Sequence, residues 1–546
     1  MVFKTVKTRV SAFIRSICLL LSLLISTSAY SINIDPSILE KFNFVQENGE
    51  TVVEVSMESL LLLTLERSTI IDILSINQKI AEDNLKATKE IYNPVLTTSA
   101  GLSHSVDISG TNLSGNIPKI SYTATAFSFS QSPYLSFSAS DVTTFSVLWN
   151  KMDTRGILYS VNYNKITSRT GLASIQNDGD SPSDWVNFDD PLYLDQLVAS
   201  LKIPIFKDWG DINKHPEYKG MIGVEQTKTI SEKTKLDLLN MIANIYWNLI
   251  GVQQNIKAIN STIHLSEQFL EDTKTRYKLG IIDSIEVKQS ETQLALNRQH
   301  LLQEKAKKSL IEDQIRAALN LSDLPYGYKA TEKLFVRDDI PDFNSLLKRV
   351  FGQNKDLELL DISIKMNQLS LTEAHNQNDT DLDLSFQYQM NGYGNDYSKA
   401  ATGISETKLH DYAIGVSWKI PLFDKVSPQK IQQTLLEKSR IDLQIENQKS
   451  QLKVELQSIL RNLKLTKESI ELAQTSANLV QDLLHKETEK FKVGNNTSFR
   501  VAQIQQDLTN ARKNEILARV QYEKSYLALL VITEDIFKYY HLPSNN

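Results

Sequence analysis

Residues 242–263 read IANIYWNLIGVQQNIKAINSTI, and this stretch decides the fold. Its apolar residues recur at alternating spacings of three and four, at Ile242, Ile245, Leu249, Val252, Ile256, Ile259 and Ile263. Strict alternation over seven positions indicates a helix that packs lengthwise against another helix, as in a coiled coil. Similar spacing covers about residues 211–278 and again about 427–492, so each helix is on the order of 100 Å long. No single globular core encloses such a rod.

The apolar seam of the first long helix recurs in the second, and each seam ends in a glycine. The two seams are Ile245, Leu249, Ile256, Ile263, Leu270, Tyr277 and Gly280, and Ile459, Leu463, Ile470, Ala477, Leu484, Phe491 and Gly494. Each long helix also follows a strand with a similar end, Lys202-Ile203-Pro204-Ile205-Phe206 or Lys419-Ile420-Pro421-Leu422-Phe423. The sequence therefore predicts an internal duplication of strand, long helix, glycine turn and returning helix, the last over about 283–319 and 497–537.

The N-terminus has the features of a secretory signal peptide. Four basic residues come first, at Lys4, Lys7, Arg9 and Arg15. An apolar run from Ile17 to Ile25 and several small residues follow, so residues 1–29 are the expected signal and cleavage is expected after Ala29. A membrane anchor is the alternative, but the run is far shorter than the roughly 20 residues that a membrane helix needs. The only cysteine, Cys18, lies in this segment, so we expect a mature chain without a disulfide, a thiol ligand or an N-terminal lipid.

The charge of the expected mature chain is mildly acidic. Removal of the four basic residues leaves 55 of the 59 Lys and Arg residues, against 65 Asp and Glu residues. An acidic exported protein argues against nucleic acid as a partner. No later apolar stretch is long enough for a membrane helix, so a place in a membrane requires a closed β-barrel, because only helices and closed barrels satisfy their backbone groups in lipid.

Alternating strands with one apolar face suit such a barrel. In the second repeat, the apolar positions are Leu382, Leu384, Phe386, Tyr388 and Met390, and then Tyr412, Ile414, Val416, Trp418 and Ile420. Small or polar residues lie between them. An apolar outside and a polar inside over about ten residues are what an outer-membrane barrel strand needs. A half-buried sheet in a soluble protein gives the same period, but the signal peptide and the long helices favour the barrel.

The two predicted repeats differ in length. The first, over residues 30–321, begins with one helix near 56–90 and has a long interval between its strands, at 103–194. This interval contains alternating stretches at 145–149 and 157–163 with a turn between them, so it is either an extended surface loop or an additional hairpin. A connector at 322–342 is expected to pack beside the helices. The second repeat, 343–546, begins with a helix over about 343–376.

The residues around the two glycine turns resemble the TolC-like outer-membrane efflux protein family. The matching residues are Tyr246-Trp247-Asn248-Leu249, then Arg276-Tyr277-Lys278-Leu279-Gly280 before Val287, and Lys490-Phe491-Lys492-Val493-Gly494 before Val501. Their order and duplication carry the resemblance, which covers nearly the whole mature chain apart from 103–194.

The resemblance implies an α+β membrane protein in the outer membrane that extends into the periplasm. It implies a homotrimer in which each chain contributes about four strands to a twelve-stranded β-barrel, continuous with a coiled-coil barrel of long helices. It further implies the exit duct of a tripartite efflux pump or of type I secretion. The expected partners are a periplasmic adaptor (membrane fusion) protein, an inner-membrane transporter and outer-membrane lipid, with no cofactor and no catalytic site.

The resemblance places the adaptor contact at the helix tips, at Tyr277, Gly280, Phe491 and Gly494. A glycine ends a helix in a left-handed conformation and leaves a smooth backbone for a partner. The alternative is that each glycine only caps its helix. The family also closes its tunnel near the tips with polar and charged side chains, including acidic residues after the second glycine.

At those matching places this sequence has Arg500 and Gln503, whereas Asp283 and Glu286 follow the first glycine. We expect these four residues to form a gate in which Glu286 and Arg500 pair within or between chains. The alternative is two solvated charges whose pairing is worth ~0–1 kcal/mol.

Strand parity places Lys202 and Lys419 on the inner face near the periplasmic end of the barrel. There they are expected to form a basic collar that favours anionic cargo. Lysines that snorkel at the membrane interface are the alternative.

The sequence does not predict an enzyme. Its eight histidines have no metal-binding spacing, and no Ser-His-Asp set, P-loop or dinucleotide fingerprint is present. The rival to the duct is a non-conducting periplasmic or surface coiled-coil scaffold or adhesin. Such a scaffold has no need of Tyr412 and Trp418 on an exposed strand face, whereas a barrel uses aromatic residues at the membrane interfaces. The cargo (drug, metal ion or polypeptide) and the identity of the adaptor stay open.

Overall fold

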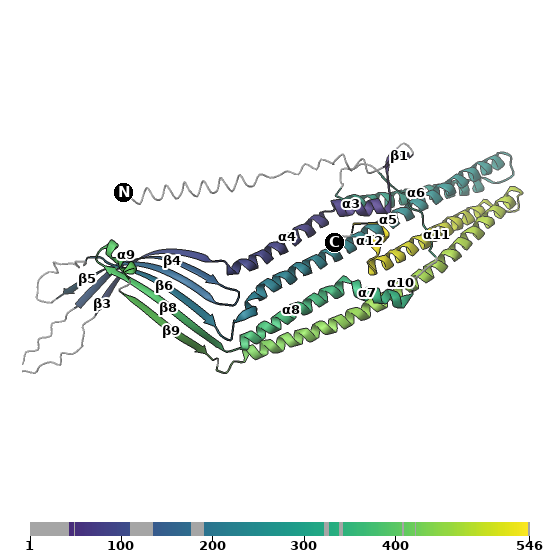
Figure 1. Ribbon diagram of the computed structural model, residues 1–546. Helices are drawn as coiled ribbons and strands as arrows, with labels where there is room; N and C mark the ends of the chain where they lie inside the picture. Colours follow the sequence, from purple (N-terminus) through teal and green to yellow (C-terminus); the bar gives the residue numbers. More distant parts are fainter. Residues whose placement is uncertain are drawn as a thin grey trace, which may run out of the picture.

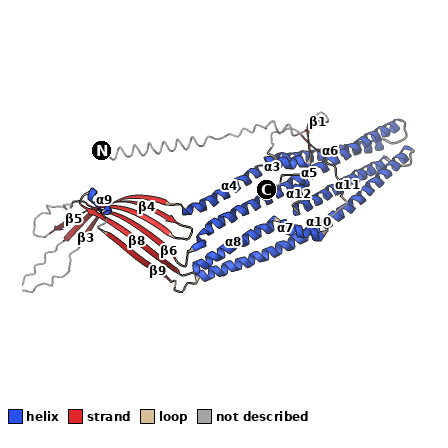
Figure 2. Cartoon of the chain, in the orientation of Figure 1, coloured by secondary structure: helices blue, strands red, loops and turns tan. Residues whose placement is uncertain are grey.

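The computed structural model describes residues 43–47, 50–109, 135–175, 190–320, 327–337, 342–406, 409–420 and 422–543. The expected signal peptide, residues 1–29, lies outside these ranges. Figure 1 shows an elongated molecule with a curved sheet at one end and long helices along the rest of its length. The chain is mostly helical with one large sheet, as Figure 2 shows, which agrees with the predicted α+β class.

The large sheet has six strands, whereas the sequence predicted about four per chain. They are β3 (Val95–Ser109), β4 (Leu135–Met152), β5 (Leu158–Ile175), β6 (Leu192–Pro204), β8 (Asp381–Gly394) and β9 (His410–Lys419). The order is β3-β4-β5-β6-β8-β9, and all neighbours are antiparallel. The interval at 103–194 therefore adds the hairpin β4–β5 to the sheet.

The turn of this additional hairpin depends on Asp153 and Gly156. The Asp153 carboxylate accepts hydrogen bonds from the backbone N–H groups of Arg155 and Ile157, at 2.9 and 3.0 Å. Gly156 has a φ of +89°, and a Cβ atom there would lie 2.3 Å from the carbonyl oxygen of Asp208. Only glycine fits both the conformation and the space, so this turn holds the hairpin against the start of the first long helix.

Two antiparallel helix pairs are joined by the glycine turns, and further helices precede or follow them. Their bounds are α3 (Met57–Arg67), α4 (Thr69–Lys89), α5 (His215–Lys278), α6 (Ser284–Ala318), α7 (Phe343–Gln353), α8 (Lys355–Asn378), α10 (Val426–Lys492), α11 (Ser498–Ile532) and the short α12 (Ile536–Tyr539). The two long helices and their returning partners are confirmed, although the second returning helix ends at Ile532 rather than near residue 537.

Each helix predicted at the start of a repeat is in fact two helices. The breaks fall at Ser68 and Asn354, which both have extended backbone with ψ near +125° (127° and 123°). The Asn354 side chain accepts hydrogen bonds from the N–H groups of Asp356 and Leu357, both at 3.1 Å, and so caps α8. Apolar spacing continues across both breaks, so periodicity alone did not reveal them.

The long helices run side by side along the molecule (Figure 1), and their contacts place them in one layer. Near the sheet, α4 packs on α5, α5 on α8, and α8 on α10. Farther from the sheet, α6 packs on α5, α5 on α11, and α11 on α10. The layer thus has two lateral edges, one formed by α4 and α6 and the other by α10.

A small sheet fastens the connector to the middle of the helix layer. It contains β1 (Asn43–Glu47), β2 (Glu50–Val55) and β7 (Gly327–Ala330), with β7 parallel to β2. The Gln253 side chain donates to the carbonyl of Tyr328 at 2.8 Å and accepts from the N–H of Ala330 at 3.2 Å. Tyr328 is buried in the largest apolar cluster. The described part of the connector therefore packs beside the helices as predicted, while its strand and those before residue 56 were not predicted.

In the described ranges, none of the helices is both long enough and apolar enough to cross a bilayer.

Candidate functional site

One face of the six-stranded sheet is apolar over its part nearer the helices, and the paired charges Lys165 and Asp195, 3.8 Å apart, lie on the same face farther from them. The register places Trp418 opposite Leu382 and Ile414 opposite Phe386, and it continues the same face through the other four strands. The members of this face include Trp418, Val416, Ile414, Tyr412, Leu382, Leu384, Phe386, Tyr388, Leu201, Ala199, Tyr159, Val161, Val147, Trp149 and Leu96. In the single chain Trp418 is 66% exposed and Tyr412 78% exposed. An apolar surface this large indicates contact with a membrane or a protein.

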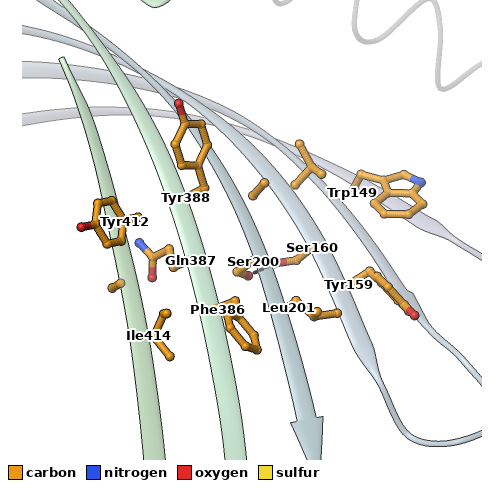
Figure 3. A pocket seen from close by; sticks show the side chains of 13 residues that line it. Trp149, Tyr159, Ser160, Ser200, Leu201, Phe386, Gln387, Tyr388, Tyr412 and Ile414 are labelled. Atoms are coloured by element: carbon orange, nitrogen blue, oxygen red, sulfur yellow. Dashed lines mark hydrogen bonds between the residues drawn. The ribbon is translucent and has the colours of Figure 1, made fainter. Parts of the chain in front are cut away.

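Figure 3 shows the middle of this face, where large side chains surround a shallow hollow of about 440 Å³. Trp149, Tyr159, Phe386, Tyr388 and Tyr412 contribute rings. The smaller side chains of Val161 and Ala199 form part of the floor between these rings. Aromatic walls around an open apolar floor suit flexible hydrocarbon chains better than a rigid polar ligand.

The opposite face of the sheet is polar, and through its middle it is uncharged. Serine hydroxyl groups pair across neighbouring strands: Ser99 with Ser146 at 2.6 Å and Ser160 with Ser200 at 2.5 Å. The Gln389 side chain donates to the Asn391 side chain at 2.8 Å along β8. Because these groups satisfy one another, the face is polar without a strong local charge.

The predicted lysine collar is not basic. Lys202 and Lys419 do lie on the polar face at the helix end of the sheet, as strand parity predicted. However, the Lys202 ammonium group lies 2.7 Å from the Asp383 carboxylate, and Lys419 is directly opposite Asp381 in the register. Two aspartates therefore balance the two lysines. The same parity rule places Asp381 and Asp383 inward, so the sequence contained the signal that would have found them.

Both glycine turns have the conformation that only glycine adopts easily. Gly280 has a φ of +68° and Gly494 a φ of +80°. Their N–H groups donate to the carbonyls of Tyr277 and Phe491, at 2.9 and 3.1 Å, so each glycine closes its helix. No atom lies within 4 Å of the position of a Cβ atom at either glycine. The capping role is therefore present, and the surface beside each glycine is open.

Tyr277 and Phe491 occupy matching positions but have opposite surroundings. Tyr277 is 48% exposed, whereas Phe491 is 3% exposed and packs on Phe269 with 4.9 Å between the ring centroids. The Arg276 guanidinium group lies 5.4 Å from the centre of the Phe491 ring. Phe491 thus joins the two helical hairpins of one chain, and its side chain does not belong to the exposed tip surface as the sequence predicted.

The expected gate residues have other partners within the chain. The Glu286 carboxylate accepts from the N–H of Ser498 at 2.8 Å, at the first turn of α11. Arg500 donates to Gln503 at 3.1 Å, and the Asp283 carboxylate caps α6 at the N–H of Ser284. The Glu286–Arg500 pair is therefore not formed inside one chain. A carboxylate at a helix N-terminus is favourable because the helix dipole and the free N–H groups are positive there.

Ser498 and Gln289 extend this contact, and neither residue was predicted from the sequence. The Ser498 hydroxyl group donates to the Gln289 side chain at 2.9 Å, so α6 and α11 are joined twice near their first turns. Ser498 follows the capping residue Thr497, and this capping signal could have indicated where α11 begins.

The lateral edges of the helix layer carry exposed apolar residues. On α10 they recur every seven residues, at Leu436 and Leu443 and again at Leu465, Leu472 and Leu479, which are 54–73% exposed. On the opposite edge, the exposed residues are Ile73, Ile76 and Ile80 of α4 and Leu302 and Leu310 of α6. The sheet ends in two unpaired strands, β3 on the α4 side and β9 on the α10 side. Within the described ranges of the single chain, no further strand pairs with β3 or β9 at these two edges.

Among the described residues, His, Cys, Asp and Glu side chains form no group of three or more with the arrangement of a metal site.

Comparison with known proteins identifies the class of fold. A solved structure of CusC, studied for the conformational changes that accompany its folding and transmembrane channel formation, has a TM-score of 0.61 and 11% identity, over 87% of this chain and 91% of that chain. The outer-membrane protein VceC of Vibrio cholerae has a TM-score of 0.58 and 13% identity, over 87% and 95%. The outer-membrane channel CmeC of Campylobacter jejuni has a TM-score of 0.60 and 13% identity, over 89% and 90%.

Neither the known protein families nor the curated proteins give a match to this sequence. The chain has the fold of the TolC-like outer-membrane channels, so the resemblance inferred from its sequence is confirmed at the level of the fold. Identities of 11–13% carry the fold alone and not the identity of cargo or partners.

Proposed function

We propose that this chain is one of three identical subunits of an outer-membrane duct that serves as the exit of a tripartite efflux pump or of type I secretion. The observation that carries the proposal is the pair of unpartnered lateral edges. Each lateral side of the chain has an unpaired strand and an exposed apolar stripe on its helices. If copies of the chain close into a ring, the strands of adjacent copies pair and the apolar stripes become buried. The apolar sheet face then lies in lipid, and the polar face lines the lumen.

The tip ends of the two seams support the ring. Leu249 and Leu270 of the α5 seam are buried inside the chain, as the α10 seam is, but Tyr277 at the end of the α5 seam is 48% exposed whereas the matching Phe491 is 3% exposed. In the proposed ring a neighbouring copy beside α6 covers Tyr277. The two halves at 30–321 and 343–546, joined by the connector at 322–342, are in this proposal products of an internal duplication, and residues 1–29 are a cleaved export signal.

The helix tips are the proposed docking surface for a periplasmic adaptor, with an inner-membrane transporter behind it. Gly280 and Gly494 have open space beside them, and Tyr277 is half-exposed. The matched test is Gly494→Leu against Asn478→Leu, an exposed position away from the tip. Loss of adaptor capture in Gly494→Leu alone supports docking at the tips. Equal capture by both variants contradicts it.

The contacts around Glu286 are the proposed lock of the closed tip. Glu286→Lys replaces the carboxylate at the N-terminus of α11 with a cation, so the two hairpins are expected to separate and single-channel conductance to rise. Glu286→Gln keeps an acceptor for Ser498 and is the control, with a smaller increase expected. Conductance that stays at the parental value in Glu286→Lys contradicts the lock.

The test of the duct itself is the mass of the detergent-purified protein together with its conductance in a planar bilayer. A trimer that gives small, discrete conductance steps is expected. A monomer that never conducts contradicts the duct and favours a coiled-coil scaffold.

A further inference from the structure

The large sheet of one chain is about as wide as its layer of helices. Neighbouring strands lie ~4.8 Å apart, and at a tilt of ~40° each strand occupies ~6.3 Å of a barrel circumference. Six strands therefore cover ~38 Å. Four helices in one layer, 8–10 Å apart, cover about 36 Å. At the same tilt, a sheet of four strands would cover only ~25 Å.

The hairpin β4–β5 is part of the wall and not a surface excursion. β4 pairs with β3 from Val95 to Ser109, and β5 pairs with β6 from Leu158 to Ser168. Its outward residues, including Phe145 and Trp149, continue the apolar face, and its inward residues, including Ser146 and Ser160, bond to serines of the adjacent strands. Both faces therefore continue across the hairpin, and the outward face also carries Lys165 of β5 beside Asp195 of β6.

The directions of the two free edges of the sheet allow them to pair with each other in adjacent copies. β3 leaves the helix layer and β9 returns to it, so these strands meet antiparallel in adjacent copies, like every other pair in the sheet. On the outward face, β9 has Tyr412 and Trp418 at its two ends, and β3 has Leu96 and Leu102 on either side of Thr98 and Ala100. Apolar side chains of both strands thus meet at the junction.

We propose that the assembled duct has an eighteen-stranded barrel, six strands from each of three copies, with the same girth as its helical tube. The inference rests on the proposed function, which supplies the three copies. It replaces the twelve-stranded barrel that the resemblance implies. The barrel is then no constriction. Between the Lys202–Asp383 pair and Asp411 its described inner side chains carry no charge, so selection of cargo by size or charge occurs at the helix tips.

The girth is measurable as a distance between spin labels in neighbouring copies. Phe386→Cys and Gln387→Cys are adjacent in β8 and face opposite sides of the wall, so the mean of their inter-copy distances reports the wall radius. An eighteen-stranded ring has a diameter of ~36 Å and equivalent sites ~31 Å apart, whereas a twelve-stranded ring has them ~21 Å apart. Labels are attached in the full chain, purified in detergent, and read by pulsed electron resonance.

A third site separates failure of this inference from failure of the proposed function. Glu446→Cys lies on the exposed surface of α10, outside the sheet, and reports whether the helices form a ring at all. A mean β8 distance of ~31 Å together with an inter-copy signal at residue 446 supports the proposal. A mean near 21 Å with that signal present overturns the eighteen-stranded barrel alone. No inter-copy signal at residue 446 overturns the assembly and with it the barrel.

Discussion

Phe491 shows how one aromatic residue joins two hairpins that are far apart in the sequence. Its ring packs on Phe269 of α5 within a cluster that also contains Leu484, Val501 and Leu508. The exposed Tyr277, at the matching place in the first seam, has no comparable cluster in its own chain. The matching seam positions thus differ: Phe491 makes a contact within the chain, whereas Tyr277 is available for contact with a neighbouring copy.

Phe491→Ala is therefore expected to destabilise the tip by ~3–5 kcal/mol, because it leaves a cavity between the hairpins. Tyr277→Ala is the matched control and is expected to change stability by less than about 1 kcal/mol in the isolated chain. Hydrogen exchange of α10 and α11 near the tip measures the difference. Equal protection in the two variants would contradict the assignment of Phe491 to the interior.

Glu534 makes the stability of the helix layer depend on pH. Burial raises the pKa of its carboxyl group to about 7 from 4.5, although the nearby Lys355 opposes part of this rise. The folded state thus holds the proton more tightly than the unfolded chain does. The resulting contribution to stability is fully present below about pH 4.5 and is lost as the pH rises through 7.

Glu534→Gln is expected to remove this pH dependence. Relative to the parent, the variant should gain on the order of 1–2 kcal/mol between pH 5 and pH 8, allowing for solvent screening. Thermal unfolding followed by circular dichroism at both pH values measures it. Glu455→Gln, an exposed acidic position on α10, is the control and should run parallel to the parent. If the stability difference between Glu534→Gln and the parent is the same at pH 5 and pH 8, Glu534 does not titrate between these pH values.

At the scale of the element, the hairpin β4–β5 distinguishes this sheet from the one predicted. Thr144 and Phe145 are adjacent in β4, and the register turns their side chains to opposite faces. Thr144 faces the polar side and Phe145 the apolar side. Their different surroundings test whether the hairpin lies in the membrane wall.

Thr144→Cys is expected to react with a water-soluble maleimide in intact membranes, and Phe145→Cys is expected to react at least about tenfold more slowly because lipid excludes the reagent. Detergent solubilisation, followed by unfolding, should equalise the two rates and serves as the control. Similar rates in the membrane would place the hairpin in water on both faces.

At the scale of the whole molecule, the exposed stripe on α10 is the expected junction between copies. Leu472 is 73% exposed in one chain, and in the proposed ring we expect it to be buried against the next copy. Leu472→Glu introduces a charge into this junction, and an unpaired buried charge is unfavourable by several kcal/mol. The variant is expected to dissociate into monomers, as measured by mass in detergent. Asn478→Glu, on another face of α10, should stay a trimer, and a trimer in both variants would contradict the junction.

Local patterns along the chain determined much of this protein. The three-four spacing from Ile242 to Ile263 predicts the long helices, Gly280 and Gly494 mark the turns, and strand alternation places Lys202 and Lys419 on the polar face. These features depend on residues within one or two turns or along one strand, where side-chain direction follows from backbone geometry. The resemblance at the tips added the class of fold, which structural comparison then confirmed.

Tertiary structure alone decided which distant residues meet. Phe491 is buried because α5 passes beside it, Glu286 binds Ser498 because two hairpins converge, and Lys202 loses its excess charge because β8 brings Asp383 beside it. The choice between a surface loop and a hairpin at 103–194 was likewise made by pairing with β3 and β6. Hydrogen bonds and packing between segments depend on register and proximity in space, and neither is contained in the periodicity of a single segment.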